Sequence, residues 1–356
     1  MAILQPIPIS ALPDLGAPKL LVVVDTEEEF DWEKPHSRTA TAVNHIKHQD
    51  RAQSIFERYG IRPTYLVDYP VAAQDVGWKP LREWLHDRKC EIGAHLHPWV
   101  NPPFEEEVSS RNSYPGNLPP ALERAKLARL TETIEANFGR RPTVYRAGRY
   151  GIGPASGAIL EELGYEVDTS VVPFTDFRHD EGPDFTRFDG DPLWLGPNRR
   201  VLELPLSVGW CGALRALGPK LQPSLLSPAG IRWHLPGLLA RTRLLERIRL
   251  TPEGATLAEL KRLADTLIAA GKRLFVFSYH SPSLVAGNTP YVRDERELAS
   301  FLERIDQFCE HFFDRCGGEA STPMAVRTLF AKSERHSADR PLESSPLGSM
   351  RAASGH

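Results

Sequence analysis

Residues 20–25 read LLVVVD, five apolar residues followed by an aspartate. Three later segments also pass from apolar residues to a final polar one: CEIGAH at 90–95, TVYR at 143–146 and LFVFSYH at 274–280. A short apolar run is typical of a strand buried on both faces, as in a parallel sheet. The carboxyl ends of parallel strands meet at one edge, where active sites lie, so the pattern predicts an enzyme. The polar residues expected to meet in its site are Asp25, His95, Arg146 and His280.

The segments between these runs have helical periodicity. In the clearest case, 119–138, Leu127, Leu130 and Ile134 are spaced three and four residues apart, and Gly139 ends the pattern. Similar patterns predict helices at 44–59, 154–163 and 294–313. Repeated alternation of strand and helix predicts the α/β class, with a parallel sheet that is either closed as a barrel or open and doubly wound.

The composition is that of a globular protein, since 41% of the 356 residues are hydrophobic and 25% are charged. A net charge of -3 disfavours a nucleic-acid-binding surface, and no nucleic-acid partner is expected. The apolar run at 20–24 is too short to span a bilayer and no basic segment precedes it, so a cytoplasmic location is expected. We expect an extended arm at 1–18, a single domain at 19–330 and a disordered tail at 331–356.

Residues 212–250 depart from the strand–helix alternation. They contain seven Lys or Arg residues and one acid, a net charge of +6, with leucines interleaved throughout. This composition predicts a basic, amphipathic helical insertion. Such a segment is more often a solvated face that docks through its leucines. The alternative is a peripheral contact with an anionic membrane surface or with a lipid-linked, phosphate-bearing substrate.

Acidic and imidazole side chains gather near two of the predicted strand ends. Residues 25–31 contain five carboxylates, which repel one another unless a cation or an arginine lies among them. His95 and His97 would face the same side of an extended segment, so both could reach one metal ion. Histidine with Asp or Glu is the ligand set of catalytic zinc sites. The two clusters together therefore predict a site for a divalent cation such as Zn²⁺.

Other residues are expected around the substrate. The segment YRAGRYG at 145–151 places two arginines and glycines at a strand end, which suits the anchoring of a carboxylate. His280, at the predicted functional edge, suits a general acid. We assign His36, His45 and His48 to the surface. The residues expected to contact substrate are Glu27, Trp99, Tyr150, Glu203 and Trp210.

The order of these motifs resembles that of the polysaccharide deacetylase family, also called the NodB-homology domain or carbohydrate esterase family 4. The resemblance covers about residues 18–320. The segments similar to the family's motifs are 24–28 (VDTEE), 91–95 (EIGAH), Arg146 with Tyr150 and Gly151, and the strand that ends in His280. Segments 164–173 and 203–205 resemble elements of the divergent branch found with lipopolysaccharide and exopolysaccharide biosynthesis genes.

The resemblance implies a distorted (β/α)₇ barrel that removes N-acetyl or O-acetyl groups from sugars with one divalent metal, usually zinc. Carried onto this chain, Asp25 would be the general base, and Arg146 would keep its pKa low. Glu28, or less favourably Glu27, would bind the metal together with His95 and His97. His280 would protonate the leaving amine, and a backbone amide near Tyr150 would help to stabilise the oxyanion.

This chain departs from the family in the spacing of its histidines, because one residue separates His95 from His97 where three are usual. A metal-free hydrolase is therefore an alternative. The leading interpretation is a metal-dependent deacetylase that acts on an N-acetylated amino sugar of a glycan or of its lipid-linked precursor. The alternatives are a hydrolase of a small, non-peptide amide and a catalytically silent glycan-binding module. The sequence does not indicate an oligomeric state.

Overall fold

The computed structural model describes residues 6–9 and 12–338. Within this part of the chain, seven parallel strands form the central sheet in the order β8-β6-β5-β4-β3-β2-β11. Their bounds are β2 (Lys19–Thr26), β3 (Thr64–Val67), β4 (Glu91–Leu96), β5 (Val144–Ala147), β6 (Val167–Asp168), β8 (Val201–Glu203) and β11 (Leu274–His280). The predicted α/β class with a parallel sheet is therefore confirmed.

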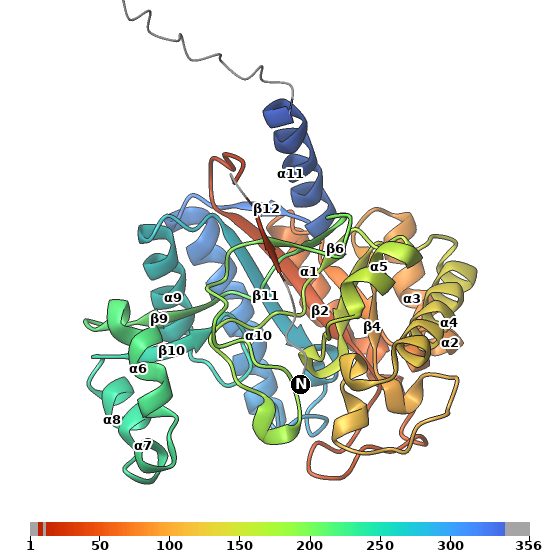
Figure 1. Cartoon of the computed structure of the whole chain (residues 1–356), viewed down its shortest axis with the longest axis horizontal. Helices are drawn as coiled ribbons and strands as arrows, with labels where there is room; N and C mark the ends of the chain where they lie inside the picture. The colour runs from red at the N-terminus through yellow and green to blue at the C-terminus, as the bar shows by residue number, and fades with distance from the viewer. Residues whose placement is uncertain (1–5, 10–11, 339–356) are drawn as a thin grey trace, which may run out of the picture.

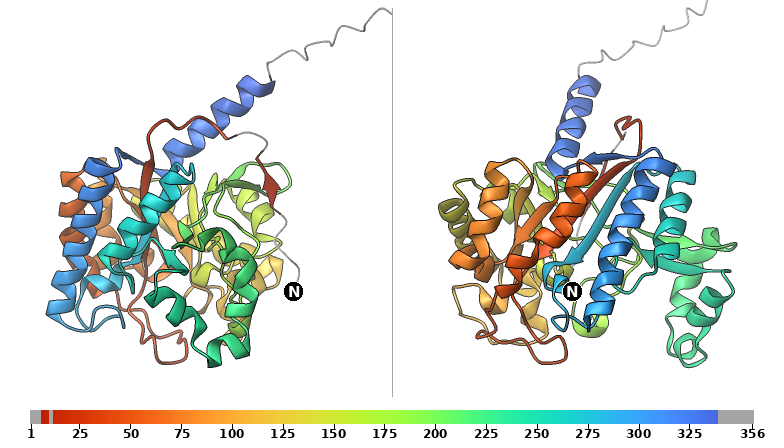
Figure 2. Two further views of the ribbon diagram at one scale, coloured as in Figure 1. Left: turned by 90° about the vertical axis from the view of Figure 1, so that its left-hand side faces the viewer. Right: turned by 180° about the vertical axis from the view of Figure 1, so that it is seen from behind.

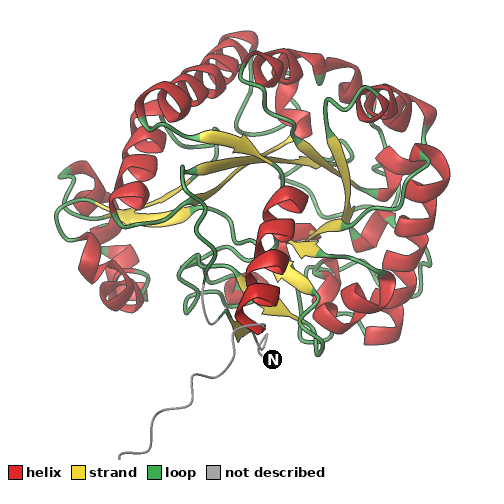
Figure 3. Cartoon of the chain, turned by 90° about the horizontal axis from the view of Figure 1, so that it is seen from above, coloured by secondary structure: helices red, strands yellow, loops and turns green. Residues whose placement is uncertain are grey.

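The helices lie around the outside of the strands (Figure 3). Those that cover the sheet are α1 (Asp50–Arg58), α2 (Tyr69–Ala73), α3 (Asp75–His86), α4 (Pro120–Phe138), α5 (Ser156–Leu163), α9 (Leu257–Ala269) and α10 (Glu295–Glu310). Their ends follow local chemistry. Gly139 ends α4 at a φ of 73°, Thr256 and Glu259 form a capping box on α9, and Asp294 caps α10.

The predicted barrel has a seam. Among the described residues, no ladder of hydrogen bonds joins β8 to β11. Instead β8 pairs antiparallel with β7 (Leu193–Leu195), which pairs with β1 (Ile7–Pro8). The seam is bridged by an antiparallel ribbon of β9 (Val208–Cys211) and β10 (Glu246–Arg249). The residues flanking this ribbon bond to β11: the Ser207 hydroxyl accepts from the Val276 N–H at 2.9 Å.

The basic insertion extends from this ribbon. It contains the helices α6 (Gly218–Leu225), α7 (Pro228–Arg232) and α8 (Leu235–Arg241), which lie to one side of the barrel (Figure 1). The prediction of a helical insertion at 212–250 was wrong at its end, because residues 246–249 form β10. There the chain must pair with β9 to reach the sheet again, and this pairing overrides the leucine periodicity.

The C-terminal prediction also needs correction. β12 (Glu319–Ser321) pairs with the first half of β2, and α11 (Pro323–Ala338) follows, projecting from the barrel in Figure 2. Residues 331–338 are therefore helical where disorder was predicted. Val326 and Phe330, one helical turn apart, are buried and anchor the helix. Residues 339–356, and residues 1–5 and 10–11 of the predicted arm, lie outside the described residues. No helix of the described chain has the length and apolar character that crossing a membrane requires.

Candidate active site

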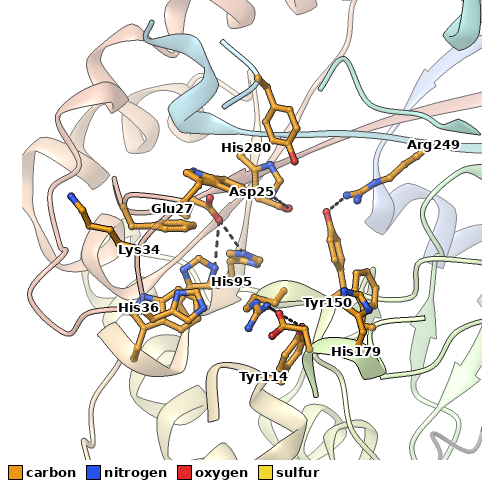
Figure 4. A pocket seen from close by; sticks show the side chains of 18 residues that line it. Asp25, Glu27, Lys34, His36, His95, Tyr114, Tyr150, His179, Arg249 and His280 are labelled. Carbon is orange, nitrogen blue, oxygen red and sulfur yellow. Dashed lines mark hydrogen bonds and ion pairs between the residues drawn. The ribbon is translucent and has the colours of Figure 1, made fainter. Parts of the chain in front are cut away.

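The parallel sheet brings the four predicted strand-end residues to one edge. In the strand register, Asp25 of β2 is level with His280 of β11, and His95 of β4 is level with Arg146 of β5. Asp25, His95 and His280 line a pocket of about 470 Å³ (Figure 4). Arg146 lies beneath it, fully buried. The pocket occupies the carboxyl edge of the sheet, where parallel folds carry their active sites.

Asp25 and Arg146 form a buried ion pair. Nη1 of Arg146 lies 2.5 Å from Oδ1 of Asp25, and its Nε donates to the Thr169 carbonyl at 2.8 Å. Burial favours the neutral acid, but the guanidinium outweighs it, together with His95 and His280, so that the pKa of Asp25 is lowered. Asp25 is therefore ionised at neutral pH and can accept a proton.

His280 is held by Glu253, a residue that the sequence analysis missed. Nδ1 of His280 lies 2.7 Å from Glu253 Oε2, and the His280 backbone N–H donates to Oε1 of the same carboxylate at 3.1 Å. The other ring nitrogen, Nε2, lies 3.7 Å from Oδ2 of Asp25. Burial alone would lower the pKa of His280, but the charge and hydrogen bond of Glu253, with Asp25, raise it. His280 therefore carries a proton more readily than an isolated imidazole.

A second cluster contains Glu27, His95 and His97. Oε2 of Glu27 lies 3.5 Å from Nε2 of both histidines. The opposite nitrogen of each ring is engaged: Nδ1 of His95 donates to the Arg146 carbonyl at 3.0 Å, and Nδ1 of His97 lies 2.8 Å from Glu28 Oε2. Burial, with repulsion from neighbouring positive charges, lowers the pKa of His95 to about 3, and burial lowers that of His97 to about 4. Both rings are therefore neutral, and both Nε2 lone pairs face the carboxylate.

This cluster fits a divalent cation. Three potential ligand atoms, one from each residue, lie close together, and all three side chains are buried. Oε1 of Glu27 is also buried and has no hydrogen-bond partner among the described residues. Burial and the nearby carboxylates of Glu28 and Asp25 raise the pKa of Glu27 well above its usual range, which is the response of an acid that lacks a counter-charge. Two imidazoles and a carboxylate are a donor set typical of catalytic zinc sites with an open position.

The structure places Glu27, the alternative ligand, beside both histidines, whereas Glu28 lies with Asp68 and His97 in a second buried group that could hold a cation. The Glu28 carboxylate accepts from the Trp99 indole N–H at 2.8 Å and contacts Nδ1 of His97, and the Glu28 backbone N–H donates to Asp68 Oδ2 at 2.7 Å. The cause is the alternation of an extended chain, in which residues 25 and 27 face one side and residue 28 the other. Glu28 thus orients His97 from behind. Gly148 leaves room for that ring, since a Cβ there would lie 2.6 Å from Cδ2 of His97.

The residues expected to contact substrate divide into two groups. Glu27, Trp99 and Tyr150 line the pocket. Glu203 and Trp210 do not. Glu203 is fully buried, where it accepts from the Val171 backbone N–H at 2.9 Å, and burial together with Asp168 raises its pKa. The chain after β6 folds over the end of β8 and separates Glu203 from the pocket, and Trp210 packs against the insertion at Gly218.

The assignment of His36 and His45 to the surface needs correction, whereas that of His48 is not contradicted. His36 lines the pocket and stacks on Trp99, with ring centroids 4.2 Å apart. Burial lowers its pKa to about 4. His45 is buried and links Glu29 to the Ser281 hydroxyl, which lies 2.7 Å from its Nε2. His48 is half-buried. All three lie in or after a long loop, where sequence periodicity gives no indication of burial.

Comparison with known proteins identifies the fold but not the activity. No protein-family model matches the chain. The pyruvate oxidase of Lactiplantibacillus plantarum is 26% identical over 187 residues, which are 49% of this chain and 29% of that protein. The chain thus spans less than a third of the length of this curated relative.

Solved structures are similar along most of the chain. A putative polysaccharide deacetylase from Mycobacterium smegmatis has a TM-score of 0.52 and 16% identity, over 92% of this chain and 96% of that one. An allantoinase (TM-score 0.49, 15% identity, 90% and 92% covered) and a probable polysaccharide deacetylase from Pseudomonas aeruginosa PAO1 (0.48, 14%, 88% and 91%) were also found. The first of these likenesses shows that the chain has a polysaccharide-deacetylase-like fold, as the motifs implied.

Proposed function

We propose that this protein is a metal-dependent hydrolase that removes an acetyl group, most simply an N-acetyl group, from an amino sugar of a polysaccharide or its precursor. One observation carries the proposal. The cluster of Glu27, His95 and His97 shares a pocket with an ionised Asp25 and with His280, whose pKa is raised by Glu253 and Asp25. The protein from Mycobacterium smegmatis with the same fold is described as a putative polysaccharide deacetylase, which supports the choice of reaction.

The arrangement meets the requirements of amide hydrolysis. Glu27, His95 and His97 would hold the cation, which when bound supplies Lewis-acid chemistry to the carbonyl and to water. Asp25 accepts a proton from the attacking water as the new C–O bond forms. His280 donates its Nε2 proton to the nitrogen as the C–N bond breaks, so that acetate and a free amine leave. Arg146 keeps Asp25 ionised, and Glu253 raises the pKa of His280 and holds its ring toward Asp25.

A second candidate function, hydrolysis of a small non-peptide amide, is favoured by the aromatic cover of the pocket. Trp32 lies edge-on to His280 at 5.0 Å and to Tyr291 at 5.8 Å, both between ring centroids. This cover narrows access above the general acid, which suits a compact substrate more than an internal unit of a long polymer. The remaining alternative is a catalytically silent glycan-binding module. Sugar binding alone would not require the paired His280 and Glu253, so this pair disfavours that alternative.

The test is acetate release by the metal-loaded protein. We expect release from N-acetylglucosamine oligomers and a loss of at least about 10³-fold in kcat for Asp25→Asn, which removes the base but not the cation cluster. Asp31→Asn, an exposed carboxylate of the same segment, is the matched control and should retain activity. Activity on small cyclic amides alone would favour the second candidate. Sugar binding that survives Asp25→Asn, with no hydrolysis of any amide, would favour the silent module.

The finer part of the proposal concerns the basic insertion, which we assign to an anionic membrane surface that presents a lipid-linked substrate. The insertion exposes apolar side chains to solvent: Trp233, in the turn between α7 and α8, is 73% exposed, and Leu238 of α8 is 57% exposed. Arg232 at the end of α7, Arg241 at the end of α8 and Arg243 just after α8 are also exposed. Exposed apolar residues among basic ones are typical of interfacial helices. The cytoplasmic location predicted from the sequence belongs to this proposal.

Vesicle sedimentation tests the membrane contact. We expect binding to vesicles that contain 30% phosphatidylglycerol and none to pure phosphatidylcholine, since about 1 kcal/mol is gained per basic residue near an anionic surface. Replacing Arg232, Arg241 and Arg243 by Gln should abolish binding. The same replacement of Arg111, Arg129 and Arg140, which are exposed on the barrel, should not. Absence of binding to either vesicle would remove the membrane contact and leave the proposed chemistry unaffected.

A further inference from the structure

Arg249 is the feature of the pocket that the proposed chemistry leaves unexplained. It lies at the end of β10, in the ribbon that bridges the barrel seam, and lines the pocket together with Asp25 and His280. Figure 4 shows its side chain on the side of the pocket opposite Glu27, His36 and His95. No catalytic step proposed above uses this guanidinium.

The guanidinium of Arg249 has no counter-ion within the described chain. Arg146 is paired with Asp25, and Arg149 with Asp180, whereas no carboxylate of the described residues forms an ion pair with Arg249. Its Nε is buried and has no hydrogen-bond partner among these residues. Its Nη2 contacts the hydroxyl of Tyr150, which is neutral and cannot compensate the charge.

The acids nearest to Arg249 are already engaged. Asp25 is bonded to Arg146 and faces His280. Glu253 is bonded to His280 and accepts from the Ser283 hydroxyl at 2.5 Å. Arg249 is half-buried, and a guanidinium withdrawn from water is stabilised by an anion and by hydrogen-bond acceptors. The Tyr150 hydroxyl supplies one acceptor, but no carboxylate of the described residues pairs with Arg249, so a molecule that enters the pocket could supply the anion.

We propose that Arg249 pairs with an anionic substituent of the substrate, a carboxylate or a phosphate carried by the acylated sugar. The inference rests on the proposed function for the placement of the acetyl group, which would lie across the pocket against Glu27, His95 and His97. Guanidinium recognises carboxylate and phosphate through paired N–H donors. Tyr150 supports the site, because its ring lies 4.6 Å from Cζ of Arg249 and its hydroxyl can donate to the same anion.

An anionic substrate also needs such a residue for electrostatic reasons. Two acids, Asp25 and Glu27, line the pocket, but the charge of Asp25 is paired with Arg146 and Glu27 would bind the metal ion. The guanidinium of Arg249, which has no counter-ion among the described residues, would attract the anion of the substrate and so orient the sugar. A neutral acetylated sugar would gain no such orientation from Arg249.

The test compares three probes that share one acylated ring: N-acetylglucosamine, which is neutral, N-acetylmuramic acid, which carries a carboxylate, and N-acetylglucosamine 1-phosphate. Binding to the full-length, metal-loaded protein is followed by tryptophan fluorescence, because Trp32 and Trp99 line the pocket. We expect at least one anionic probe to bind tenfold or more tightly than the neutral one. Which of the two does so identifies the anion.

The variants separate charge from structure. Arg249→Gln should lower the affinity for the anionic probe at least tenfold more than the affinity for N-acetylglucosamine and so remove the preference, while Arg249→Lys should retain part of it. Arg247→Gln is the matched control, since Arg247 lies on the same strand but outside this pocket. Equal affinities for all three probes in the natural protein, or a preference that survives Arg249→Gln, would overturn the inference.

Acetate release, measured in parallel, keeps the two proposals apart. A preference for the anionic probe without acetate release leaves the role of Arg249 standing and removes the proposed reaction. Acetate release at equal kcat/KM from neutral and anionic probes, with no difference in binding, would support the proposed reaction and overturn the role of Arg249. A variant that fails to fold is recognised by its melting temperature, and the Arg249→Lys protein then carries the comparison.

Discussion

Glu253 determines both the position and the charge of His280. Its carboxylate binds the ring and the backbone N–H of the same residue, so the imidazole cannot rotate without losing both contacts. Burial alone would discharge His280, and Glu253 reverses the direction of the pKa shift. In the proposed reaction, Glu253 would favour the protonated form of His280, the proposed acid, although Glu253 does not itself line the pocket. Glu253 is in this sense a positioning residue.

The pH dependence of activity tests this role. An acid must be protonated to act, so the rate falls as pH rises through the pKa of His280. Glu253→Gln removes the charge that raises this pKa, and we expect the alkaline limb of the kcat/KM profile to move to lower pH by about one unit. The acidic limb, which reports Asp25, should move less. Glu297→Gln, which removes an exposed carboxylate on α10, is the control, and an unshifted alkaline limb in Glu253→Gln would refute the role.

At the residue scale, the sequence was sufficient to predict the pocket residues that lie at the ends of strands. Asp25, His95, Arg146 and His280 end four apolar runs, and parallel pairing alone brings such ends together. The two-residue spacing that puts His95 and His97 on one side applies equally to Asp25 and Glu27, but family resemblance favoured Glu28 instead. Glu253 and Arg249 could not be predicted, because each acts through a partner that is distant in sequence and neither lies in a distinctive local pattern.

At the scale of elements, α4 contains a buried acid with a measurable cost. Glu123 is 2% exposed, and its one side-chain partner in the described chain is the hydroxyl of Ser156 at the start of α5. Burial raises its pKa to about 7, although the Ser156 hydrogen bond opposes this. The hydrogen bond joins α4 to α5, but ionisation of the carboxyl destabilises the folded state.

The sign of the pH effect follows from linkage. The folded protein binds the Glu123 proton more tightly than the unfolded chain, whose pKa is 4.5, so stability is lost as pH rises from about 4.5 to 7. The loss amounts to about 3 kcal/mol at most. We expect Glu123→Gln to raise the free energy of unfolding in urea at pH 8 by about 1–3 kcal/mol and to change it little at pH 5. Glu132→Gln, exposed on the same helix, should change neither; a gain for Glu123→Gln that is equal at both pH values would contradict the assignment.

The elements also show where sequence patterns fail. The helices that cover the barrel were predictable, because each buries one apolar stripe against the sheet. β9 and β10 are short strands within a leucine-rich and arginine-rich segment, and only their pairing across the seam makes them strands. The end of α11 has the composition of a disordered tail, yet Val326 and Phe330 provide the one helical turn of burial from which the helix extends.

At the scale of the whole molecule, the seam and the pocket are connected. The ribbon that bridges β8 and β11 supplies Arg249, and the chain that follows it supplies Glu253. The same ribbon carries the basic helical insertion, so the proposed membrane contact, anion site and general acid lie along one continuous stretch of chain. A barrel closed by direct pairing of β8 with β11 would leave no place for these residues.

Cation binding should stabilise the whole fold. Without a cation, burial and the neighbouring carboxylates oppose the ionisation of Glu27 beside the two histidines, and a bound cation would compensate its charge. A ligand that binds only the folded state adds about 2.7 kcal/mol at a hundredfold excess over its Kd. We expect Zn²⁺ or Co²⁺ to raise the melting temperature by several degrees and a chelator to reverse the rise.

Glu27→Gln should abolish this response. In the metal-free state, this variant should also melt at a higher temperature than the natural protein, because the buried acid without a counter-charge is gone. The exposed group of Asp265, His311 and Cys316 could also bind a cation, so Asp265→Asn is the control that must keep the full response. An equal rise in the natural protein and in Glu27→Gln would show that the cation binds elsewhere.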